Sequence, residues 1–131
     1  MAPNKYTWIL LLGLVLIAML ASPAYSKVGE IGQIKGSGVL EREGDIVIDG
    51  NAGVGVLSMD EAVTANGTMR IDFVDETRVE LTEQSRLVID EFVYDPANDI
   101  GSLSMKASLG TVRYASGQIA KKYKQNCSFC I

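Results

Sequence analysis

Residues 68–94, TMRIDFVDETRVELTEQSRLVIDEFVY, decide the fold of this 131-residue chain. Apolar and polar residues alternate in this stretch, and the alternation restarts twice after a short polar segment. Because successive side chains of a strand point to opposite faces of a sheet, each run predicts a strand with one apolar and one charged face. The apolar members of the three runs are Met69, Ile71 and Phe73, then Val79 and Leu81, then Leu87 and Ile89. The stretch therefore predicts an antiparallel meander of three strands.

The segments on either side predict further short strands separated by turns. The predicted strands lie within residues 28–40, with a break at 36–38, and at 46–48, 54–57, 100–108 and 109–114. Asn66-Gly67 is a strong hairpin signal, because both residues tolerate a positive φ. Ser58–Ala65 resembles the start of a helical turn, and Gln118–Tyr123 predicts a short helix. About seven to nine short strands predict a single small all-β domain, either a sandwich or roll or a β-helix-like arrangement.

The first 26 residues have the pattern of a secretory signal peptide. Lys5 precedes an apolar run, Ile9–Ala21, which is followed by Pro23 and by small residues at Ala24 and Ser26. With Trp8 included, the run spans about 14 residues, short of the ~20 that a membrane-spanning helix needs, so we predict cleavage after Ser26 and export. The alternative is an uncleaved N-terminal membrane anchor. Residues 27–122 then form the β domain, and residues 123–131 form an irregular tail.

The charge of the chain argues against nucleic-acid binding. The formal net charge is −4, and residues 27–113 contain 8 basic and 16 acidic residues. Such an acidic body repels a phosphate backbone. The partner expected instead is an envelope protein or a cell-wall component, and the oligomeric state is left open.

The residues that could carry chemistry are few. The chain has no histidine, and its two cysteines are Cys127 and Cys130 near the C-terminus. Their C-x-x-C spacing lacks the strand–helix setting of a redox site, so a local disulfide is the preferred interpretation. Zinc would need two further ligands. We therefore predict no cofactor and no metal.

Carboxylates and aromatic residues offer two weaker alternatives. Asp72, Asp75, Glu76, Asp90 and Glu91 could suggest a glycosidase pair or a calcium site, but the alternation places Asp72 and Asp90 on the solvated face. We therefore predict no catalytic residue and no enzymatic activity.

The aromatic alternative is a sugar-binding face. Tyr94 and Tyr114, with Phe92, could line such a face in a carbohydrate- or peptidoglycan-binding module. The competing interpretation is that these rings belong to the core near strand ends.

The order of strands and turns resembles the FecR domain family. The residues that carry the resemblance are Asp60–Gly67, Ile71–Thr77, Ser85–Pro96 and Gly110–Gly117, the last reading GTVRYASG and followed by Ile119-Ala120-Lys121. The resemblance covers about residues 28–122. It implies an extracytoplasmic all-β domain without enzymatic activity, similar to the outer, signal-receiving domain of iron-uptake regulators.

Two departures from the family pattern stand out. Asp75-Glu76 occupies the position where the family usually has Asp-Gly, the pair better suited to a tight turn. The closing strands that usually follow the Ser-Gly segment are replaced by the segment ending in Cys130-Ile131. We therefore expect an exported, FecR-like binding or signalling domain with a shortened C-terminus. A truncated remnant without a stable function is the further alternative.

Overall fold

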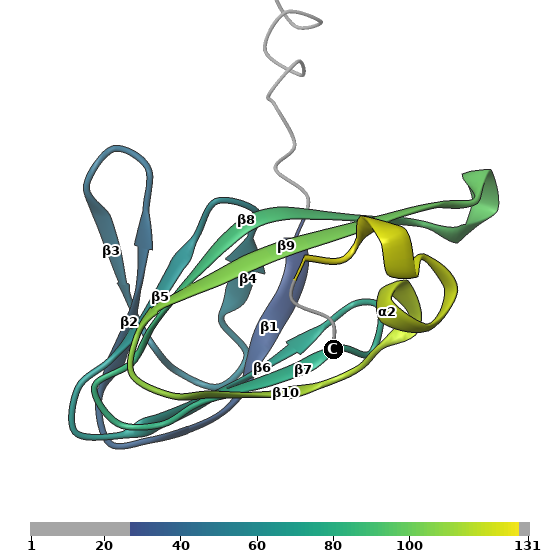
Figure 1. Ribbon diagram of the computed structural model, residues 1–131. Coiled ribbons are helices and arrows are strands. Elements are labelled where there is room, and N and C mark those ends of the chain that lie inside the picture. Colours follow the sequence, from purple (N-terminus) through teal and green to yellow (C-terminus); the bar gives the residue numbers. More distant parts are fainter. Residues whose placement is uncertain (1–26, 129–131) are drawn as a thin grey trace, which may run out of the picture.

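The computed structural model describes residues 27–128, which form ten strands in two five-stranded antiparallel sheets (Figure 1). The strands are β1 (Lys27–Lys35), β2 (Gly38–Arg42), β3 (Ile46–Asp49), β4 (Gly55–Leu57), β5 (Glu61–Thr64), β6 (Thr68–Phe73), β7 (Arg78–Leu81), β8 (Arg86–Asp95), β9 (Ile100–Leu109) and β10 (Val112–Ala115). The first sheet has the order β10-β7-β6-β1-β4, and the second sheet has the order β3-β2-β5-β8-β9. The predicted all-β class is confirmed, in the form of two packed sheets.

The two sheets are halves of one folded sheet. Strand β1 continues along the chain into β2, β3 into β4, β5 into β6, β7 into β8, and β9 into β10, and each of these steps crosses from one sheet to the other. The lateral order of these five long strands is the same in both sheets. Each long strand therefore bends once at a corner, and a single five-stranded sheet closes over its own core (Figure 1).

Neighbouring corners are joined by backbone hydrogen bonds. The N–H of Ala65 donates to the carbonyl of Ser37 (3.2 Å), and the N–H of Gln84 donates to the carbonyl of Ala65 (2.9 Å). Two corners use glycine in the left-handed region, with φ of 77° at Gly36 and 76° at Gly110. Glycine lacks the Cβ that disfavours this conformation in other residues. The corners thus continue the hydrogen-bonding ladder around the bend.

Gln84 holds the corner between β7 and β8 with a positive φ of 50°, and its side chain is exposed. We expect Gln84→Gly to raise the free energy of unfolding by roughly 0.5–1 kcal/mol, because glycine removes the left-handed strain at some cost in chain entropy. Chemical denaturation measures the change. The matched control is Gln33→Gly, in which an exposed glutamine of strand β1 is replaced where φ is not positive; this variant should be less stable. Equal destabilisation of both variants would contradict the prediction.

The predicted three-stranded meander is correct for its first two strands and wrong for the third. Strands β6 and β7 pair antiparallel, with Met69 opposite Leu81 and Ile71 opposite Val79. Strand β8, however, pairs with β5 and β9 in the second sheet. The polar segment 82–85 is a corner and not a hairpin turn. Alternation alone cannot separate these cases, because both sheets direct their apolar faces to the same core.

Asn66-Gly67 is likewise a corner, so the hairpin predicted there is wrong. It connects β5 of the second sheet to β6 of the first. Gly67 is required for close approach rather than for a positive φ: a Cβ built on it would lie 2.0 Å from the carbonyl oxygen of Lys35. The preference of this position for glycine was visible in the sequence, but its physical reason was not.

The helical start suggested for residues 58–65 is also wrong. Residues 61–64 form β5, in which Ala62 lies opposite Leu40 on one side and Leu87 on the other. Pairing on both sides within the second sheet outweighs the weak helical preference of so short a segment.

The core lies between the two sheets and confirms the alternation seen in the sequence. The apolar residues of the three runs, Met69, Ile71, Phe73, Val79, Leu81, Leu87 and Ile89, are all 5% exposed or less. The rings of Phe73 and Phe92 stack across the core, with centroids 5.1 Å apart. Because Phe73 belongs to β6 and Phe92 to β8, this contact joins the two sheets directly.

A short helix, α2 (Gln118–Lys122), covers the end of the core remote from the β2–β3 hairpin (Figure 1). This helix confirms the one predicted at 118–123. Asp75, which is fully buried, holds it in place: its carboxylate accepts hydrogen bonds from the N–H of Ile119 (3.0 Å) and from the N–H and hydroxyl of Thr77 (3.0 and 2.7 Å). The carbonyl of Asp75 also accepts from the N–H of Gln118 (2.7 Å). The turn between β6 and β7 is thereby tied to α2.

The segment after α2 lies against β9. It contains a 3-10 turn, η2 (Lys124–Asn126), and the N–H of Ser128 donates to the carbonyl of Leu103 (2.9 Å). A second 3-10 turn, η1 (Pro96–Asn98), joins β8 to β9. Among residues 27–128, no helix combines the length and the apolar character needed to span a bilayer.

Candidate functional site

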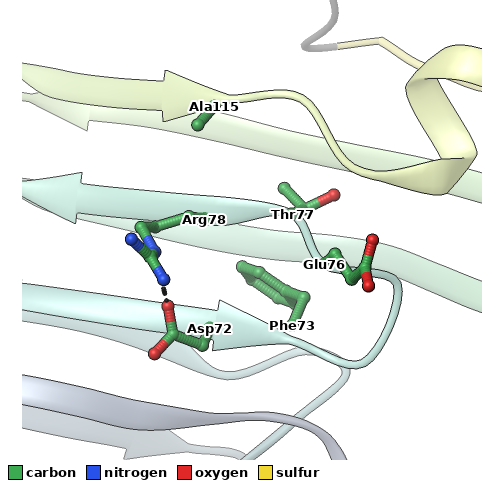
Figure 2. A pocket seen from close by; sticks show the side chains of 6 residues that line it. All are labelled: Asp72, Phe73, Glu76, Thr77, Arg78 and Ala115. Carbon is green, nitrogen blue, oxygen red and sulfur yellow. Dashed lines mark hydrogen bonds and ion pairs between the residues drawn. The ribbon is translucent and has the colours of Figure 1, made fainter.

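One surface hollow of about 440 Å³ lies at the ends of β6, β7 and β10 (Figure 2). Its lining residues are Asp72, Phe73, Glu76, Thr77, Arg78 and Ala115. Asp72 accepts from Arg78 (3.0 Å) and from Arg70 (3.2 Å), and Glu76 accepts from Gln118 (3.0 Å). Each charged group in this hollow is therefore already paired within the protein. Asp72, Arg70 and Arg78 form a surface ion-pair network that links β6 to β7.

A second surface, here called the hairpin groove, lies between the β2–β3 hairpin and the turn joining β4 to β5. It consists of two adjoining hollows of about 400 and 350 Å³ that share Arg42, Glu43, Ile46 and Met59. The remaining lining residues are Glu41, Asp45, Val47, Leu57, Ser58, Asp60, Glu61 and Val88. The hairpin projects beyond the body of the folded sheet (Figure 1).

The hairpin groove exposes three large apolar side chains. Ile46 is 53% exposed, Val47 is 61% exposed and Met59 is 52% exposed. Ile46 and Val47 are neighbours on β3 and so point to opposite faces of the hairpin. An exposed group of apolar side chains with a polar rim is the usual mark of an interaction surface.

A buried ion pair fixes the floor of the groove. Asp60 is 1% exposed and accepts from Nε of Arg42 at 3.0 and 3.2 Å and from the N–H of Leu57 at 2.9 Å. Arg42 also donates from Nη2 to the carbonyl of Gly55 (2.7 Å). The hairpin is thus fastened to the β4–β5 turn, where Met59 has a positive φ of 72°. The groove has a defined shape before any partner binds.

The rim of the groove is acidic. Glu41 and Glu61 both accept from Arg86 (3.2 and 2.7 Å). The hydrogen bond that Arg86 donates to Glu61, together with the nearby negative charges, raises the pKa of Arg86 against the opposing effect of burial. Three further carboxylates, those of Glu43, Asp45 and Asp49, form no ion pair with any residue in the described part of the chain. These three charges face solvent around β3.

Tyr94 and Tyr114 lie on different sheets. Tyr94 belongs to β8 of the second sheet and Tyr114 to β10 of the first, and both are half-buried against the core. Burial raises the pKa of the Tyr114 phenol, and the charge of Asp75 adds to this effect. The structure thus gives both rings packing roles and does not join them in one stacking face.

The other candidate residues are placed as follows. Asp75 is buried as a structural acceptor, Asp72 is paired with arginines, and Asp90 and Glu91 are exposed on β8. Within residues 27–128, no group of three or more histidine, cysteine or carboxylate side chains is arranged to hold a metal ion.

The proposed pairing of Cys127 with Cys130 lies partly outside the described residues, because Cys130 is beyond residue 128. Cys127 itself forms an isolated parallel bridge with Leu103 of β9, and its Sγ lies 4.0 Å from the hydroxyl of Tyr114. The second sheet and β10 of the first sheet therefore both contact this residue.

The hairpin groove was not predicted from the sequence. Residues 46–48 were predicted as a short strand, and of its three apolar residues only Ile48 packs against the core. One signal was available: three consecutive apolar residues between Asp45 and Asp49 do not alternate, so one face of that strand had to be apolar and unexplained.

Comparison of the chain with protein-family models, with curated proteins and with solved structures found no match. The class of protein is therefore defined by the structure alone: a small all-β domain made of one folded antiparallel sheet, with an open apolar groove beside a projecting hairpin.

Proposed function

We propose that this protein is an exported, FecR-like β domain that acts by binding another envelope protein, without a catalytic step. The observation that carries the proposal is the hairpin groove, in which Ile46, Val47 and Met59 are each more than half exposed. Burying such side chains against a partner removes apolar surface from water, the main favourable term in protein association.

The rigidity of the groove supports a binding role. In the Arg42–Asp60 ion pair, Asp60 is buried and accepts two hydrogen bonds from the partly exposed Arg42, so the pair holds the hairpin close to the β4–β5 turn. A preformed surface loses less conformational entropy on binding than a flexible one. The groove is therefore better suited to recognition than a mobile loop would be.

Export is supported by the sequence of residues 1–26, with its basic start, short apolar run and small residues before Lys27. The resemblance of residues 28–122 to FecR domains agrees with a role in signalling or contact at the bacterial envelope. A protein partner is favoured over a cell-wall sugar because the exposed residues of the groove are aliphatic, whereas sugar-binding faces use exposed aromatic rings.

Site-specific photocrosslinking in bacteria that produce the full chain tests the proposal. A photoreactive residue at Val47 should give a discrete crosslinked protein product. The control position is Leu109, which is apolar and also 61% exposed but lies at the opposite edge of the second sheet. Crosslinks at Val47 and not at Leu109 support the proposal. Equal labelling at both positions, or none at either, would overturn it.

A further inference from the structure

We infer that the free edge of β3 binds an extended, basic segment of the partner as an added strand. This inference rests on the proposed function and specifies the chemistry of the partner at the same groove. The features that support it are the unpaired edge of β3, its two-faced apolar pattern and the carboxylates around it.

Strand β3 is the edge strand of the second sheet and pairs with β2 alone. Alternate residues of an edge strand direct their N–H and carbonyl groups away from the sheet, where they can pair with another chain. The four residues Ile46–Asp49 span about 13 Å at ~3.3 Å per residue, enough for a partner segment of similar length. Binding by strand addition would continue the ladder that already runs across the second sheet.

The side chains of β3 offer contacts on both faces of an added strand. Ile46 lies opposite Arg42 and lines both hollows of the groove, and Val47 lies opposite Glu41 and lines only the larger hollow. An added strand at the free edge would therefore place alternate side chains beside Ile46 on one face and beside Val47 on the other. Apolar residues on one face of the added strand would cover Ile46, and apolar residues on its other face would cover Val47.

The carboxylates around β3 favour a partner segment with positive charge. Asp45 precedes the strand, Asp49 is its last residue and Glu43 lies in the turn before it. None of the three is in an ion pair with a described residue. Lysine or arginine residues in the added strand would meet these carboxylates. The same carboxylates would repel an acidic segment.

The same charges argue against a second copy of this chain as the occupant. In an antiparallel pair of two β3 strands, Asp45 of one copy would approach Asp49 of the other, and like charges opposite one another destabilise a strand pair. The lysines of the chain's own C-terminal segment lie at the other end of the molecule, where Lys122 pairs with Asp99 (3.0 Å) (Figure 1). A basic segment of a separate protein fits the edge of β3 better than a second copy of the chain or the chain's own C-terminal segment.

The test titrates the full exported chain with a capped peptide of about six residues that alternates lysine and valine, followed by NMR of the backbone amides. We expect saturable shifts confined to β3, β2 and the β4–β5 turn. A peptide that alternates glutamate and valine is the charge control. The lysine–valine peptide with alternate backbone nitrogens methylated is the strand-pairing control, because it lacks the required donors. Neither control should bind measurably.

A triple variant, Glu43→Gln, Asp45→Asn and Asp49→Asn, tests the role of charge without removing side-chain volume. Asparagine also tolerates the positive φ of 59° at Asp45. We expect affinity to fall roughly tenfold, and the wild-type affinity to fall similarly when salt shortens the Debye length from about 10 Å to about 3 Å.

The outcomes separate this inference from the proposed function. Crosslinks at Val47 without binding of the lysine–valine peptide would overturn the inference and leave the binding function standing. Binding of the methylated peptide, or of the glutamate peptide with equal affinity, would also overturn it. Dimerisation of the chain through β3, seen by sedimentation and lost in Val47→Lys, would identify a second copy as the occupant and overturn it as well.

Discussion

Replacing Gly67 with alanine is expected to lower the free energy of unfolding by roughly 3 kcal/mol, the upper range for forcing extra volume into a packed site. The added Cβ would lie 2.0 Å from the carbonyl oxygen of Lys35 and 2.8 Å from the nitrogen of Ser37. Both atoms belong to the backbone of the neighbouring corner, so neither can move like a flexible side chain. The two corners would have to separate, and the hydrogen bond from Ala65 to Ser37 would be strained.

Gly44→Ala is the matched control for this prediction. Gly44 lies in the β2–β3 turn with a φ of 81°, and a Cβ built on it would meet no atom within 4 Å. Its replacement therefore measures the cost of the left-handed conformation alone, about 1 kcal/mol. Urea denaturation of both variants gives the comparison. A Gly67→Ala variant no less stable than Gly44→Ala would show that the corners are not closely packed and would contradict the folded-sheet account.

The sequence predicted the strands well and their connections poorly, for one physical reason. Alternation depends only on which side of a strand faces the core, and this pattern is the same whether two consecutive strands form a hairpin or bend across a corner. The pairing of β6 with β7 could be predicted for that reason. The passage of β8 into the other sheet depends on the corner at Ser85, which is fully buried and accepts a hydrogen bond from the N–H of Thr111 (3.1 Å). Such a contact between distant segments leaves no local mark in the sequence.

The candidate site was less predictable than the fold. Exposure of Ile46 and Val47 follows from the place of β3 at the edge of the second sheet, which only the strand pairing reveals. The burial of Asp60 and Asp75 could not be predicted either, since each aspartate is followed directly by a glutamate, and such an acidic pair suggests solvent exposure. The Asp75-x-Thr77 spacing did offer a signal, because an aspartate that accepts from the N–H two residues later is a common turn motif.

The turn around Asp75 provides the second large expected effect. Asp75→Ala should lower the free energy of unfolding by about 3 kcal/mol or more. The substitution removes a charged acceptor that serves the N–H groups of Thr77 and Ile119 and the hydroxyl of Thr77, all in a buried setting. Buried donors without an acceptor cost about 1–3 kcal/mol each, whereas the lost side chain itself contributes little packing. Asp75→Asn keeps one acceptor oxygen, so its free energy of unfolding should lie between those of Asp75→Ala and the wild type.

Asp72→Ala is the control, because Asp72 is a carboxylate in the same stretch that is one-third exposed and paired with two arginines. Exposed ion pairs contribute about 0–1 kcal/mol, so this variant should lose far less stability. Amide hydrogen exchange locates the effect: Asp75→Ala should speed exchange at Ile119 and in α2 more than in β6. If Asp75→Ala and Asp72→Ala were equally stable, Asp75 would not be the link between the β6–β7 turn and α2. Uniform acceleration across both sheets would instead show that α2 closes the core as part of one cooperative unit with the folded sheet.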